Sequence, residues 1–132
     1  NHRRVAISGD GGETWSPARP DETLIEPPAQ VSILRLAPAA GGAGPARLLF
    51  SNPASTRRER MTVRVSTDEG RTWPASRVVY DGPSAYSSLV ALKGADIGLL
   101  FERGERSPYE TITFAVFTLP WIAAGKDAPV AR

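Results

Sequence analysis

Short runs in which apolar and polar residues alternate fill most of this chain, and glycine, proline and aspartate separate them. Alternation with a period of two is typical of β-strands that bury one face, and apolar runs of helical length and period are absent. Strands are predicted at residues 5–8, 16–21, 31–36, 48–51, 61–66, 77–80, 86–92, 98–102 and 111–118. The strand at 16–21 contains two prolines, so we expect it at a sheet edge. The chain is therefore predicted to be all-β.

One eight-residue pattern, Ser-x-Asp-x-Gly-x-Thr-Trp, occurs twice, at residues 8–15 and 66–73. Each position has a structural role in a tight hairpin: the aspartate accepts backbone N–H groups, the glycine takes a positive φ, and the tryptophan covers the turn with apolar surface. The fixed residues are Ser8, Asp10, Gly12, Thr14 and Trp15 in the first copy, and Ser66, Asp68, Gly70, Thr72 and Trp73 in the second. We expect both aspartates to be structural and both tryptophans to lie in the core.

A repeat built from short strands over several tens of residues is typical of a β-propeller. Four-stranded blades take about 40–50 residues each, so about three fit in 132 residues. We predict a partial blade at the start, a complete blade over 31–80, including a loop without chemistry at 38–45, and a closing blade over 86–118. A turn at 81–84 would separate the last two. Residues 1–125 are then part of a larger ring, which a distant strand would close, and 126–132 form a tail.

Composition adds mainly exclusions. The chain is 41% hydrophobic and 23% charged, as in a globular protein, and its net charge of +2 is too small to indicate nucleic-acid or membrane attraction. It has no cysteine and one histidine, so neither a disulfide framework nor a metal-ligand set is predicted. No apolar run approaches the roughly 18 residues of a membrane span.

The repeated octapeptide resembles the Asp-box of bladed β-propellers, which is best known from sialidases. Residues 51–102 further resemble the carboxy-terminal part of bacterial exo-sialidases with a six-bladed propeller. The matching pieces are Ser51-Asn52-Pro53, an arginine eight residues before the second box, Ser84-Ala85-Tyr86-Ser87 and Leu99-Leu100-Phe101-Glu102, continued by Pro108-Tyr109-Glu110. The resemblance implies about three blades of such a propeller, with Asp-box hairpins.

The resemblance assigns chemistry to two residues. Arg58 falls on an arginine that grips the carboxylate of sialic acid, and guanidinium suits this role because it binds a planar carboxylate with two parallel hydrogen bonds. Arg57 is the alternative for this position, although counting back from Ser66 favours Arg58. Tyr86 falls on the nucleophile of the family. A neutral phenol is not repelled by the substrate carboxylate, whereas an aspartate or glutamate would be.

Glu102 falls on a glutamate that orients another arginine in the family; otherwise it would be an exposed charge paired with Arg103 or Arg106. The other catalytic groups of the family would precede Asn1, so we expect the 132 residues alone to be inactive.

Taken together, the resemblance implies a retaining exo-α-sialidase that cleaves terminal sialic acid from glycoconjugates, a reaction for which we expect no metal or organic cofactor. It also implies secretion or a cell-surface location, and missing amino-terminal blades as partners. The alternative is a non-catalytic Asp-box propeller that binds carbohydrate or protein, since fold does not determine function. A nucleic-acid surface around residues 57–64 ranks last because it rests on local charge alone.

Overall fold

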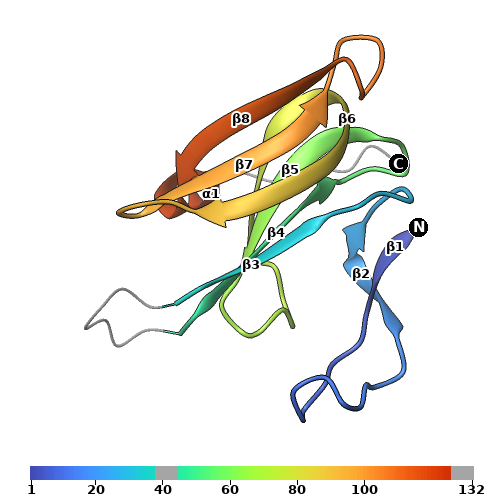
Figure 1. The fold of residues 1–132 in the computed structure, drawn as a ribbon, viewed down its shortest axis with the longest axis vertical. Helices are drawn as coiled ribbons and strands as arrows, with labels where there is room; N and C mark the ends of the chain where they lie inside the picture. The colour runs from blue at the N-terminus through green and yellow to red at the C-terminus, as the bar shows by residue number, and fades with distance from the viewer. Residues whose placement is uncertain (38–44, 126–132) are drawn as a thin grey trace.

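The computed structural model describes residues 1–37 and 45–125, which form two antiparallel sheets (Figure 1). The predictions of a loop at 38–45 and a tail at 126–132 fall almost entirely outside these residues. The elements are β1 (His2–Val5), β2 (Arg19–Ile25), β3 (Ser32–Leu36), β4 (Arg47–Pro53), β5 (Glu59–Ser66), β6 (Ala75–Ala91), β7 (Asp96–Arg103), β8 (Thr111–Thr118) and α1 (Leu119–Ala123). Strands β1 and β2 pair with each other, and the other six form one sheet in sequence order.

The first Asp-box joins β1 to β2. Both strands lie farther from the box than predicted, and residues 6–18 between them are outside the β1–β2 ladder. The backbone N–H of Ser16 still donates to the carbonyl of Ile7 (2.9 Å), so the chain is already paired where the box begins and ends. The predicted strand at 16–21 therefore becomes β2, three residues later.

Strand β6 differs most from the prediction, because it is one 17-residue strand where two strands and a turn were expected. Its first half pairs with β5 as far as Pro83, and its second half pairs with β7 from Ser84 onward. The predicted turn at 81–84 is wrong: the carbonyl of Arg58 accepts the N–H of Ser84 (2.9 Å), and the carbonyl of Pro83 accepts that of Gly104 (3.1 Å). Proline lacks an N–H, so it sits where the strand changes partner.

The main core lies between the two halves of the six-stranded sheet, which curls over on itself (Figure 1). Buried side chains from both halves meet there, among them Leu49, Met61 and Val63 from β4 and β5 and Ile97, Leu99 and Phe101 from β7. The short helix α1 adds Ile122 to this core. Alternation could not reveal α1, since five residues are too few to show a helical period.

The two Asp-boxes have the predicted geometry. In the second box, Asp68 accepts from the backbone N–H of Thr72 (2.9 Å) and from its hydroxyl (2.6 Å), and Ser66 Oγ accepts from the N–H of Gly70 (2.8 Å). Asp10 makes the same bonds to Thr14. These bonds hold the pKa of Asp68 down, to about 2, because they favour the charged carboxylate.

The tryptophans of the two boxes differ, which corrects one prediction. Trp73 is buried against Phe50, with ring centroids 5.7 Å apart, whereas Trp15 is 63% exposed. The indole N–H of Trp15 donates to the carbonyl of Gly12 in its own turn (3.0 Å). The indole N–H of Trp15 therefore has its hydrogen-bond partner within its own turn, and its ring is left largely uncovered by the described residues.

Candidate active site

Arg58 lies in the loop that leads into β5, and its guanidinium contacts two other loops. Nη2 donates to the carbonyl of Pro28 (2.7 Å), and Nη1 donates to the phenol oxygen of Tyr109. The guanidinium carbon stands 5.3 Å from the ring centroid of Tyr86 and 5.7 Å from that of Tyr109. Desolvation lowers the pKa of Arg58, but the two tyrosine side chains outweigh it and raise that pKa, so the group stays cationic.

Tyr86 lies in the second half of β6 and points out of the core. Side chains alternate along this half, so Ser87 and Leu89 are buried while Tyr86 is 42% exposed. Tyr86 borders a hollow of about 150 Å³ that Gln30 and Glu102 also line. The phenol is thus accessible to a ligand and lies beside a permanent positive charge.

Glu102, near the end of β7, is held to the backbone of Tyr86. Its Oε2 accepts the backbone N–H of Tyr86 (3.2 Å). Within residues 1–37 and 45–125, Glu102 has no ion-pair partner, and Arg103 instead donates from Nε to the hydroxyl of Thr113 (2.8 Å). The pairing of Glu102 with Arg103 or Arg106 is therefore not what the structure shows.

Arg57 and Arg58 are neighbours in sequence but have different surroundings. Arg57 donates from Nε and Nη2 to Glu59 Oε1 (3.2 and 3.1 Å), and its side chain is 79% exposed. Of these two arginines, Arg58 is the one beside Tyr86. Arg60 also pairs with a carboxylate, that of Asp81 (3.5 Å), and Arg64 is buried. The cations of residues 57–64 therefore do not form one open basic patch.

Three residues around Arg58 and Tyr86 were not assigned a role from sequence. Pro28 and Gln30 come from the β2–β3 loop; the amide oxygen of Gln30 accepts the backbone N–H of Ser87 (3.3 Å), next to Tyr86. Tyr109 comes from the β7–β8 loop. It stands in the stretch that resembles sialidases, which was an available signal, whereas nothing in the sequence marks Pro28 or Gln30.

The same β2–β3 loop begins with a partly buried ion pair. Glu26 Oε1 lies 2.7 Å from Arg3 Nε, and the Glu26 side chain is 9% exposed. Burial raises the pKa of Glu26, and the charge of Arg3 opposes that rise without cancelling it. Asn52 donates to the carbonyl of Ile25 (2.8 Å), so β4 also holds the loop in place.

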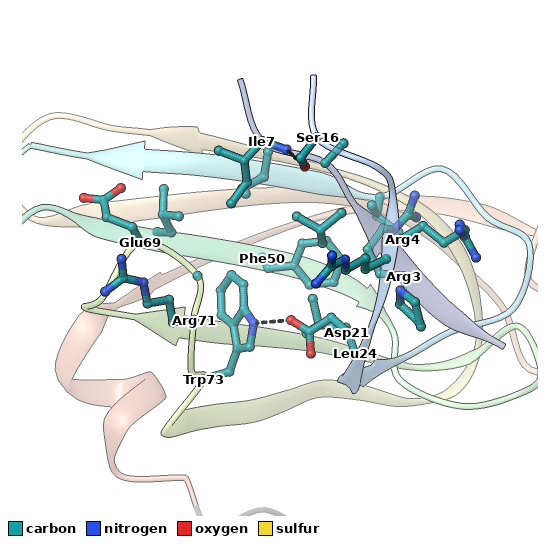
Figure 2. Close-up of a pocket in the computed structure, with 18 of the residues that line it drawn as sticks. Arg3, Arg4, Ile7, Ser16, Asp21, Leu24, Phe50, Glu69, Arg71 and Trp73 are labelled. Carbon is teal, nitrogen blue, oxygen red and sulfur yellow. Dashed lines mark hydrogen bonds between the residues drawn. The ribbon is translucent and has the colours of Figure 1, made fainter. Parts of the chain in front are cut away.

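A larger cavity of about 820 Å³ separates the β1–β2 hairpin from the face of β3 and β4. Figure 2 shows the indole of Trp73 directed at the carboxylate of Asp21, with Phe50 and Leu24 beside it. The walls of this cavity are largely apolar, and the cavity is not lined by Arg58, Tyr86 or Glu102. This cavity is therefore distinct from the site around Arg58 and Tyr86.

No group of three potential metal-binding side chains occurs in the described part of the chain. The described residues also include no helix with the length and apolarity needed to cross a membrane.

Comparisons with known proteins identify the family and the fold of the chain. A model of the BNR repeat-like domain matches residues 1–99. A sialidase of Micromonospora viridifaciens is 43% identical over 124 residues, covering 92% of this chain and 18% of that protein. Human sialidase-4 is 33% identical over 124 residues, covering 88% of this chain and 22% of that protein. The chain thus spans about a fifth of the length of these curated relatives.

A solved structure, the Hadza microbial sialidase Hz136, superimposes with a TM-score of 0.75 at 33% identity. The match covers 92% of this chain and 24% of that structure. The prediction of an all-β fold built from sialidase-type propeller blades is confirmed by this similarity and by the antiparallel sheets.

Proposed function

The chain belongs to the family of the BNR repeat-like domain, with sialidases among its relatives, and from this premise we propose that it supplies part of the active site of an exo-α-sialidase. The observation that carries the proposal is the position of Arg58, whose guanidinium carbon is 5.3 Å from the ring centroid of Tyr86. A carboxylate clamp and a phenol nucleophile must act on adjacent atoms of the same sugar, so they must lie side by side.

In this mechanism Arg58 binds the substrate carboxylate through charge-assisted hydrogen bonds. The phenol oxygen of Tyr86 attacks the anomeric carbon, and the bond to the leaving oxygen breaks. Water then releases sialic acid from the glycosyl-enzyme, and the tyrosine is restored. An ordinary tyrosine has a pKa of about 10, so a general base must take its proton and an acid must protonate the leaving group.

Glu102 would act at one remove from the reaction. Its Oε2 holds the backbone of Tyr86 at 3.2 Å. Its other oxygen is then available to orient a second arginine, which would come from polypeptide outside these residues. The missing acid, base and arginines would come from further blades of the same propeller, and we expect the 132 residues alone to release no sialic acid.

The partners implied are sialylated glycoconjugates, which fits a secreted or cell-surface protein. A non-catalytic carbohydrate-binding propeller is the second candidate. It is supported by the same three residues, because an arginine flanked by two tyrosine rings can bind an anionic sugar without a general base.

The deciding experiment measures release of a fluorogenic leaving group from an α-sialoside by the full protein carrying this chain, beside its Tyr86→Phe variant. Phenylalanine keeps the ring next to Arg58 and removes the nucleophilic oxygen. Activity that is lost in the variant supports the sialidase with Tyr86 as nucleophile. Inactivity of both favours the binding propeller, and equal activity would keep the sialidase and exclude Tyr86 from its chemistry.

A further inference from the structure

Arg58 is held from two sides before any ligand arrives. The Pro28 carbonyl accepts from Nη2 at 2.7 Å, and the Tyr109 phenol oxygen accepts from Nη1. The ring of Tyr109 also faces the guanidinium, with its centroid 5.7 Å from the guanidinium carbon. Since guanidinium has five N–H donors, the bonds to Pro28 and Tyr109 leave other donors of Arg58 available to a ligand.

The loop that carries Tyr109 is itself rigidly built. Glu110 accepts from three successive backbone N–H groups, those of Glu105 (2.9 Å), Arg106 (3.0 Å) and Ser107 (2.8 Å). These three bonds lower the pKa of Glu110, as expected when donors stabilise the charged carboxylate. At the start of the loop, Tyr80 donates its hydroxyl to the carbonyl of Gly104 (2.7 Å).

We propose that Tyr109 is a positioning residue, which fixes the guanidinium of Arg58 in the orientation that binds the ligand carboxylate. An arginine free in solvent has many rotamers and loses that freedom when it binds. Holding the side chain in place beforehand removes this cost from the binding step and so raises affinity. The phenol suits the role, because its oxygen accepts from Arg58 while its ring stacks on the same group.

This inference rests on the proposed function, and it gives the two tyrosines beside Arg58 separate tasks. Tyr86 borders the hollow shared with Glu102, whereas Tyr109 does not line it. Under the proposed function Tyr86 acts at the reacting carbon, whereas Tyr109 acts on the arginine because its phenol oxygen accepts from Nη1 of Arg58.

The test is the Tyr109→Phe variant of the full protein, with Tyr80→Phe as the matched control. Tyr80→Phe also removes a phenol hydroxyl bonded to this loop, but the partner of that hydroxyl is the Gly104 carbonyl rather than Arg58. It therefore measures the effect of losing one loop bond while the contact between Tyr109 and Arg58 keeps its hydroxyl. Binding of N-acetylneuraminic acid is measured by calorimetry, and turnover of a fluorogenic α-sialoside by kcat and KM. We expect Tyr109→Phe to weaken acid binding and raise KM about tenfold, the scale of one hydrogen bond to a charged group. A change in kcat of less than about twofold should accompany it.

A double-mutant cycle isolates the route through Arg58. In an Arg58→Lys background, Tyr109→Phe should weaken acid binding by less than about twofold further, because the guanidinium that Tyr109 positions is gone. Unchanged binding in Tyr109→Phe, an equal effect of Tyr80→Phe, or additive losses in the double variant would each overturn the assignment. Loss of kcat at constant KM would instead make Tyr109 a reacting group.

The binding measurement separates this inference from the proposed function. A wild-type protein that binds the acid without turning over the sialoside would contradict the sialidase, yet still test Tyr109. A wild-type protein that does neither would overturn both.

Discussion

Trp73 donates its indole N–H to a carboxylate oxygen of Asp21 across 3.2 Å, although 52 positions separate the two residues. The bond joins the second Asp-box to strand β2, and therefore the β1–β2 hairpin to the six-stranded sheet. The equivalent tryptophan, Trp15, bonds within its own turn. One repeated motif thus serves two purposes, a local closure and a link between sheets.

Truncating the two tryptophans should separate these purposes. Trp73→Ala is expected to lower the free energy of unfolding by about 3–5 kcal/mol, because it empties a buried site against Phe50. Trp15→Ala should cost no more than about 1 kcal/mol, since that residue is already 63% exposed. Urea unfolding of both variants in the full protein provides the measurement. Equal losses would contradict the different roles of the boxes.

The second Asp-box should make stability depend on acidity. Hydrogen bonds lower the folded pKa of Asp68 to about 2 from its ordinary value of 3.8, so its contribution to stability is fully present above about pH 4 and is lost as the pH falls toward 2. Asp68→Asn should therefore lower Tm at pH 7 and weaken the fall in Tm between pH 4 and 2. Asp96→Asn is the control, because Asp96 is exposed and its carboxylate makes no hydrogen bond among the described residues. A Tm profile shared by Asp68→Asn and the wild type would refute this prediction.

The β7–β8 loop should not tolerate a side chain at Gly104. A Cβ there would lie 2.1 Å from the carbonyl oxygen of Ser107 and 2.7 Å from the carboxyl group of Glu110. We expect Gly104→Ala to cost about 1–3 kcal/mol, as overpacking does, and to weaken ligand binding by displacing Tyr109. Gly9→Ala is the matched substitution, since its Cβ would meet nothing within 4 Å. Thermal unfolding decides the matter, and a Gly104→Ala protein as stable as Gly9→Ala would count against the rigid loop.

Adjacent arginines should differ sharply in function. Arg58→Lys is expected to raise KM for an α-sialoside by about 10–100-fold, because lysine keeps the charge but cannot reproduce two parallel hydrogen bonds. Arg57→Lys should change KM by less than about threefold, since Arg57 is exposed and its contact with Glu59 is a surface ion pair. Steady-state kinetics of both variants provides the comparison. A larger effect at Arg57 would move the carboxylate clamp to that residue.

The sequence by itself was sufficient for the features that depend on local chemistry. Alternation located the strands of the six-stranded sheet, although it divided β6 into two. The spacing within each box determined the bonds from Thr14 to Asp10 and from Thr72 to Asp68. The bonded residues are four positions apart, so both partners can be identified within the octapeptide itself.

Tertiary structure decided what depends on contacts between distant segments. The continuity of β6 follows from pairing with β5 on one half and β7 on the other, which overrides the turn tendency of Asp81 to Ser84. The burial of Trp73 and the exposure of Trp15 follow from which sheet lies against each hairpin. The meeting of Arg58 with Tyr109 spans 51 positions and depends on how far the sheet curls, which no local pattern encodes.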